Sequence, residues 1–161
     1  MTDRFFEKGG QRDQRGQYLL QTRIFVHELF HAIDDHGERF SMVNDEFASL
    51  IGLVHTDNGW KRINVTESEE HIQHDVANRI TQLLTMNQYE DAWNAGRVYA
   101  TRPEIALPSM RALDSPAEAF AEIGAHLLLD PTVATYVKPQ VIDYFRDRVF
   151  PTFAAPPTPG L

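Results

Sequence analysis

Three polar side chains set into one apolar helical pattern constrain the fold of this sequence more than any other feature. Between residues 17 and 35 the apolar positions recur at three- and four-residue spacing, which predicts an amphipathic helix. His27, Glu28 and His31 fall inside this stretch. Their apolar neighbours, which indicate that the helix is buried, are Val26, Leu29, Phe30 and Ile33. Imidazole and carboxylate groups in a buried helix need polar partners, so the fold must bring other polar side chains to this helix.

The composition is that of one ordinary globular domain. The 161 residues are 42% apolar and 24% charged, and a chain of this length can bury a substantial core. The net charge of −8 argues against non-specific binding to nucleic acid, because an acidic surface repels phosphates. The absence of cysteine excludes disulfides and thiolate zinc sites. No apolar run could span a bilayer, and the first ten residues lack the apolar core of a signal peptide, so secretion would depend on a signal or a larger protein beyond this sequence.

The remaining patterns predict a mostly α (α+β) architecture in one domain over residues 1–153. Further helices are expected at 44–52, 67–86, 115–129 and 139–150. The second of these is expected to turn inward Ile72, Val76, Ile80 and Leu83. Asp57-Asn58-Gly59, between β-prone runs at 53–56 and 60–65, predicts a hairpin. Residues 94–114 are expected to be mostly loop, residues 1–15 loosely ordered, and the tail 154–161 disordered.

The His-Glu-x-x-His motif at residues 27–31 has a definite chemical meaning on a helix. Positions four apart lie on the same face, one turn from each other, so His27 and His31 can bind one tetrahedral zinc ion. Glu28 lies beside them and can take a proton from a metal-bound water, which predicts hydrolysis of a bond whose carbonyl the ion polarises. The other interpretation is a surface helix whose histidines bind nothing, and the apolar neighbours argue against it.

A catalytic zinc site needs a third protein ligand. Glu118 and Glu122 are four residues apart on the helix predicted at 115–129, so their carboxylates share one face. Glu118 has a second interpretation, because it stands three residues after Ser115, where a capping box has a glutamate. The other candidates for the third ligand are Glu122, Glu46, Asp45 and His55.

Other tyrosine and histidine residues carry weaker assignments. Tyr99, in the predicted loop, is the candidate to stabilise the oxyanion of a tetrahedral intermediate. The alternatives for this catalytic role are Tyr89, Tyr136 and Tyr144. A second acidic and imidazole cluster, expected to be the solvated face of a helix rather than a metal site, comprises His71, His74 and Asp75. His126 is expected to be a core or rim histidine with polar partners rather than a ligand.

The segments HELFHAID (27–34) and SPAEAFAE (115–122) together resemble the gluzincin-type toxin peptidases of the anthrax lethal factor and Pro-Pro endopeptidase group. The segment DEFASLIG (45–52) is similar to the phenylalanine-to-glycine segment that follows the motif in those proteins. The resemblance implies a zincin-like catalytic domain in which Glu118 is the third zinc ligand. It also implies that Glu122 accepts a hydrogen bond from the outer nitrogen of a ligating histidine and fixes its tautomer.

The same resemblance implies a zinc endopeptidase, a bacterial toxin or effector, that acts on a protein or peptide and has an inhibitor or immunity protein as a further partner. In that group a sheet precedes the motif helix. Here the hairpin at 53–65 would replace that sheet, or the chain would be the C-terminal part of a longer protein. Three alternatives stay open: another zinc hydrolase such as an amidase or a regulatory peptidase, an inactive zinc-holding interaction domain, and a helical interaction domain without metal. Glu28 argues against the inactive domain, because a structural zinc site needs no base.

Overall fold

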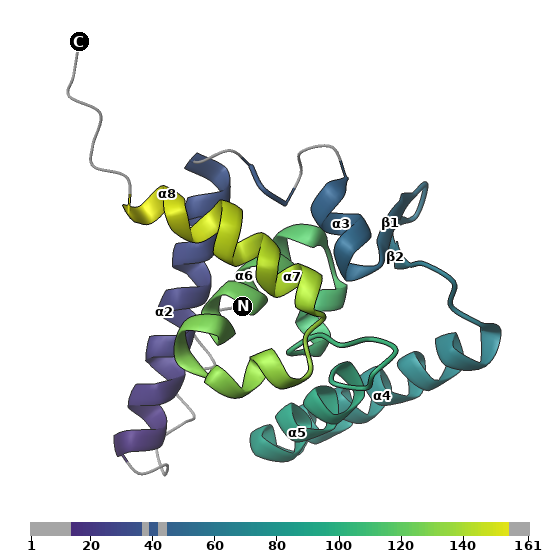
Figure 1. Cartoon of the computed structure of the whole chain (residues 1–161). Helices are drawn as coiled ribbons and strands as arrows, with labels where there is room; N and C mark the ends of the chain where they lie inside the picture. Colours follow the sequence, from purple (N-terminus) through teal and green to yellow (C-terminus); the bar gives the residue numbers. More distant parts are fainter. Residues whose placement is uncertain (1–13, 37–38, 42–44, 155–161) are drawn as a thin grey trace.

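The computed structural model describes residues 14–36, 39–41 and 45–154 (Figure 1). This part of the chain is mostly helical with one small sheet, as the sequence predicts. The elements in chain order are α2 (Gln14–His36), α3 (Glu46–Ile51), β1 (Leu53–Thr56), β2 (Gly59–Arg62), α4 (Glu67–Thr85), α5 (Tyr89–Ala100), the 3-10 turn η1 (Met110–Leu113), α6 (Pro116–Leu129), the 3-10 turn η2 (Pro131–Thr135), α7 (Pro139–Tyr144), the π-helical turn η3 (Phe145–Val149) and α8 (Phe150–Ala154). Within these residues no helix is long and apolar enough to cross a membrane. The predictions for residues 1–13 and 155–161 lie outside the described part.

The region 94–114, predicted to be mostly loop, is helical at both ends. Helix α5 extends to Ala100 and η1 begins at Met110, which leaves residues 101–109 irregular. The buried residues of α5 are Ala92, Gly96, Tyr99 and Ala100. Three of these four are small, and the residue before the helix, Gln88, makes no side-chain capping hydrogen bond, so the sequence offers no clear start signal for a helix here. The prediction of loop there is therefore wrong.

The core lies between α2, α3, α6 and the segment α7–α8, and the ring of Phe120 on α6 is at its centre. The Phe120 ring centroid lies between 4.9 and 5.9 Å from the centroids of four other rings, those of Phe30, Phe40, Phe47 and Phe145. Aromatic pairs at such distances contribute about 0.5–1.5 kcal/mol each beyond their burial. Because Glu118 and Glu122 are on the same helix, this core also holds the acidic face of α6 in position.

Helix α2 is buried on one face only. Phe30 is 1% exposed, whereas Leu29 is 43% exposed, so the prediction that Leu29 helps to bury the motif is wrong. The inward position predicted for Ile72 on α4 is also wrong, since that side chain is 37% exposed. The face of α2 that carries His27, Phe30 and His31 packs against α6 (Figure 1).

The two helices approach most closely where Phe30 meets Gly124 of α6. A Cβ atom added at Gly124 would lie 2.4 Å from carbons of the Phe30 ring, far inside the contact distance of two carbon atoms. The ring therefore lies directly against the backbone of α6, in space that only glycine leaves free. This contact sets the separation of the two helices that carry the motif and its candidate third ligand.

The small sheet and the helices α4 and α5 lie to one side of this core (Figure 1). Strands β1 and β2 pair antiparallel with Thr56 opposite Gly59, so the predicted hairpin is present and its turn consists of Asp57 and Asn58. Helices α4 and α5 pack along each other, and both β2 and α5 contact η1. Since η1 also packs on α6, it joins this side of the molecule to the core.

We expect Gly124→Ala to destabilise the protein by about 1–3 kcal/mol, because the new methyl group overlaps the Phe30 ring. Gly96→Ala in α5 is the matched control, since its Cβ would lie 3.3 Å from the side chains of Ile80 and Met110, which can shift. Alanine is also the better helix former there, which offsets part of any crowding. Urea unfolding midpoints measure both changes, and equal shifts in the two variants would contradict the close contact.

Candidate metal centre

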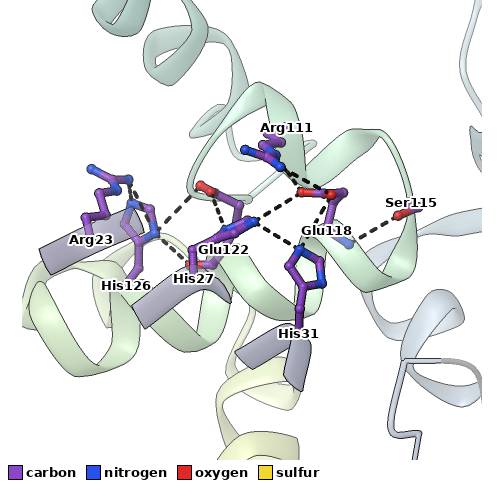
Figure 2. A network of polar contacts seen from close by, with 8 residues as sticks. All are labelled: Arg23, His27, His31, Arg111, Ser115, Glu118, Glu122 and His126. Carbon is purple, nitrogen blue, oxygen red and sulfur yellow. Dashed lines mark hydrogen bonds and ion pairs between the residues drawn. The ribbon is translucent and has the colours of Figure 1, made fainter. Parts of the chain in front are cut away.

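Helices α2 and α6 bring His27, His31 and Glu118 together (Figure 2). The Nε2 atoms of the two histidines are 3.0 Å apart. Glu118 places Oε2 3.3 Å from Nε2 of His27 and Oε1 3.5 Å from Nε2 of His31. One ligand atom from each of the three residues lies within 4.8 Å of the others, and among the described residues this is the one such group that could hold a metal ion.

The separations within this group fit a tetrahedral ion. Two ligands bonded to zinc at about 2.0–2.1 Å in tetrahedral geometry lie about 3.3 Å from each other. The two imidazole nitrogens are 3.0 Å apart. Oε2 of Glu118 is 3.3 Å from Nε2 of His27, and the other oxygen, Oε1, is 3.5 Å from Nε2 of His31. Each separation is close to the tetrahedral value, with a different oxygen of Glu118 facing each ring. Two imidazole nitrogens and one carboxylate also form the kind of ligand set that zinc accepts. The side chains of His31 and Glu118 are each 24% exposed, so the group is open to solvent on one side.

Glu122 holds the ring of His27 from the opposite side. Its Oε1 lies 2.9 Å from Nδ1 of His27, within hydrogen-bond distance. A proton on Nδ1 shared with this carboxylate leaves Nε2 of His27 unprotonated, and Nε2 is the atom that faces Glu118 and His31. Burial alone would raise the pKa of Glu122, but interactions with His27, Ser109 and His126 outweigh it and lower the pKa to about 2.

Two further polar side chains, His126 and Arg23, lie on the side of Glu122 away from Glu118 (Figure 2). His126 is 6% exposed, its Nδ1 donates to the backbone oxygen of Glu122 at 2.7 Å, and the guanidinium of Arg23 contacts its Nε2. Burial, and then the positive charge of Arg23, lower the pKa of His126. Arg23 in turn lies over the ring of Trp93, 4.0 Å from its centroid. The prediction that His126 is a buried histidine with polar partners is confirmed.

Glu118 does not complete the predicted capping box. The hydroxyl of Ser115 accepts the Glu118 N–H at 3.1 Å, so Ser115 caps α6 as expected. The carboxylate of Glu118, however, lies against the two histidines and against Arg111, whose Nε is 2.6 Å from Oε2. In α4 the corresponding Glu69 does return to the backbone of its cap, Thr66. The contrast indicates that the carboxylate of Glu118 is directed by side chains around it and not by the helix end.

Arg111 is the charged neighbour of this group that sequence analysis missed. It is on η1, a short turn without apolar periodicity, and its contact with Glu118 depends on the packing of η1 against α6. Burial alone would lower the pKa of Arg111, but Glu118 and the more distant charges of Glu122 and Glu28 raise it. Glu28 itself is exposed on α2, next to His27 in sequence, and its charge helps to raise the pKa of Arg111.

The other candidates for the third ligand have different partners. Glu46 on α3 forms an ion pair with Arg148, with 2.6 Å between Oε2 and Nη1. The ring of His55 packs edge-on against Trp60 in the hairpin. Asp45 is the N-cap residue of α3, with a left-handed backbone. None of these three belongs to the group that contains His27 among the described residues.

The second predicted cluster is solvated, as expected. His71, His74 and Asp75 are all exposed on α4. Nδ1 of His71 contacts the backbone oxygen of Glu67, and Nδ1 of His74 lies 3.1 Å from the side-chain nitrogen of Asn78. Both contacts lie within α4 itself, as expected of a solvent-facing helix.

Tyr99 lies in helix α5, so its predicted position in a loop is wrong. Its side chain is 3% exposed and part of the core, and its hydroxyl accepts from Nη1 of Arg62 on β2 at 3.3 Å. The network of polar contacts around His27 includes neither Tyr99 nor the alternatives Tyr89, Tyr136 and Tyr144 (Figure 2). The assignment of the oxyanion to Tyr99 therefore stays a prediction for which these contacts give no support.

The low pKa of Glu122 predicts that it contributes to the acid sensitivity of the folded protein. Its pKa of about 2 is below the ordinary value of 4.5, so the ionised carboxylate stabilises the fold above about pH 4.5 and this contribution is lost as the pH falls towards 2. We expect Glu122→Gln to be less stable than the parent at pH 6 and to lose less on acidification. Urea midpoints with chelator at about pH 6 and pH 3.5 measure this.

The control for this measurement is Glu104→Gln, since Glu104 likewise pairs with a basic side chain, Arg102, but is 44% exposed. We expect its stability to fall with pH in parallel with that of the parent. A parallel fall in Glu122→Gln would show that Glu122 does not have the depressed pKa.

Comparisons of this chain with protein families, with curated proteins and with solved structures each find no match. A functional assignment therefore depends on the chain's own residues. The group of His27, His31 and Glu118, with Glu122 behind it, is the feature on which such an assignment can be built.

Proposed function

We propose that this chain is a zinc-dependent peptidase in which His27, His31 and Glu118 hold the metal and Glu28 is the general base. One observation carries the proposal. Residues from two helices far apart in the sequence converge at separations that fit a tetrahedral ion, and the outer nitrogen of His27 lies 2.9 Å from the carboxylate of Glu122. A histidine anchored in this way by a second carboxylate is the usual arrangement at protein metal sites.

Each side chain has a distinct part in this proposal. Bound zinc would supply a Lewis acid that polarises a carbonyl and acidifies water. His27 and His31 would hold the ion through their Nε2 atoms, and Glu122 would keep His27 in the tautomer that allows this. Glu118 would add a carboxylate oxygen as the third protein ligand, which would leave room at the ion for water or substrate. Glu28, exposed on the same helix, accepts the proton from the attacking water and delivers it to the leaving amine.

The choice of a peptide as substrate is supported by the resemblance of residues 27–34 and 115–122 to the gluzincin-type toxin peptidases, which also makes a role as toxin or effector the proposed biological setting. An amidase or a regulatory peptidase would use the same four residues. An inactive zinc-holding domain is less favoured, because Glu28, exposed next to His27 in the motif, would have no role at a purely structural zinc site. A helical interaction domain without metal would have no use for two imidazole nitrogens 3.0 Å apart.

We expect purified protein to bind about one zinc ion per chain. His27→Ala, His31→Ala and Glu118→Ala should each lose that zinc, because each removes one of three protein ligands. Ser115→Ala is the control for Glu118: it removes the cap of α6, should cost about 0.5–2 kcal/mol of stability, and should keep the zinc. Metal analysis and zinc titration measure these results. A parent protein that takes up no zinc would refute the proposal.

We expect Glu28→Gln to keep zinc and fold but to lower peptide hydrolysis by about 10²–10⁴-fold, the usual contribution of a general base. Cleavage of a peptide library by the zinc-loaded protein, followed by mass spectrometry, measures the activity. Glu90→Gln, an exposed position on α5, should be as active as the parent. Full activity in Glu28→Gln would remove the base assignment, and cleavage of simple amides but of no peptide would favour the amidase.

A further inference from the structure

Arg111 is presented to the candidate metal centre from a well-anchored turn. Its neighbours Ala112 and Leu113 are 0% and 7% exposed, and η1 packs on α6. The backbone N–H of Asp114 donates to the carbonyl of Arg111 at 3.0 Å, which closes the turn. The side chain of Arg111 is 55% exposed and extends from this turn to Glu118 (Figure 2).

The guanidinium shares both oxygens of Glu118 with the two histidines. Nε of Arg111 is 2.6 Å from Oε2, the oxygen that lies 3.3 Å from Nε2 of His27. Nη2 of Arg111 is 3.5 Å from Oε1, the oxygen that lies 3.5 Å from Nε2 of His31. The carboxylate therefore has imidazole nitrogens on one side and a fixed positive charge on the other.

We propose that Arg111 sets the metal affinity of this site, because its positive charge weakens the binding of a divalent cation by His27, His31 and Glu118. The inference rests on the metal-binding part of the proposed function and not on hydrolysis. An ion bonded to Glu118 lies about 2 Å from a carboxylate oxygen. With the guanidinium 2.6 Å from the same carboxylate, the two positive groups come within about 5 Å of each other.

Two effects of Arg111 on metal binding oppose each other, and their sizes decide the sign. Arg111 holds the carboxylate of Glu118 in place before the metal binds, so metal binding costs less side-chain conformational entropy. This effect alone would raise the metal affinity severalfold. The repulsion between a single and a double positive charge about 5 Å apart is worth roughly tenfold or more, even with the dielectric constant of water. The repulsion therefore wins. Arginine stays protonated at working pH, so this charge persists.

The experiment titrates zinc into the whole protein, stripped of metal, in competition with a chelating dye. We expect Arg111→Ala to bind zinc about tenfold or more tightly than the parent, and Arg111→Lys, which keeps the charge, to stay within about threefold of it. The tightening should shrink as the salt concentration rises, because salt screens partly exposed charges. A residue that only shapes the site would not give this dependence on salt.

The matched control is Arg148→Ala. Arg148 is 56% exposed and lies 2.6 Å from the carboxylate of Glu46, so its removal changes the net charge and breaks the same kind of ion pair on another part of the protein. We expect its zinc affinity to equal that of the parent. If Arg111→Ala does not fold by circular dichroism, Arg111→Gln removes the same charge with a side chain closer in size.

Each other outcome overturns the inference. Unchanged or weaker zinc binding after removal of the charge shows that Arg111 does not oppose the metal. Equal tightening in Arg111→Lys and Arg111→Ala assigns the effect to hydrogen-bond geometry and not to charge. Equal tightening in Arg148→Ala assigns it to net charge alone. In all these cases the parent binds zinc and the proposed function stands, whereas failure of every variant and of the parent to bind zinc refutes both.

Discussion

The contact of the Phe30 ring with the backbone at Gly124 determines how closely α2 and α6 approach, and the rest of the site depends on that distance. The two histidines are on one helix and the two glutamates are on the other. A small change in the separation of the helices would alter every distance between these side chains at once. The aromatic cluster around Phe120 holds the same interface from the other side, so the polar group does not have to keep the helices together by itself.

The polar residues of this interface form one connected series. It runs from Arg23 through His126, Glu122 and His27 to Glu118, and it ends at Arg111 (Figure 2). Each carboxylate of the series lies between two nitrogen-bearing groups. Glu122 lies between His126 and His27, and Glu118 lies between His27 and Arg111. Buried polar groups are costly without partners, and the carboxylate of Glu122, 2.9 Å from Nδ1 of His27, offsets part of the cost of burying His27 next to an aromatic core.

Sequence analysis predicted the elements whose residues have a strong local pattern. The motif helix, the hairpin, α4 and the capped helix α6 follow from periodicity, the Asp-Asn-Gly turn and Ser115, which act over a few residues. It also placed Glu118 and Glu122 on one face of a helix. It missed α5, whose buried side chains are small, and it missed Arg111, whose relation to Glu118 exists only after η1 has packed on α6. For the same reason it could not show that Glu118 turns away from the helix end.

The Phe30 and Gly124 pair has a consequence for evolution. Phe30 occupies a position of the His-Glu-x-x-His motif that the chemistry of the motif leaves free, but here packing restricts it. A larger residue at 124 can be accommodated only if the ring at 30 is replaced by something smaller, and neither change is tolerated easily alone. In an alignment of relatives, the side chains at positions 30 and 124 should therefore covary in size. This covariation would identify distant relatives of the chain even where residues 37–115, which connect the two helices, have diverged.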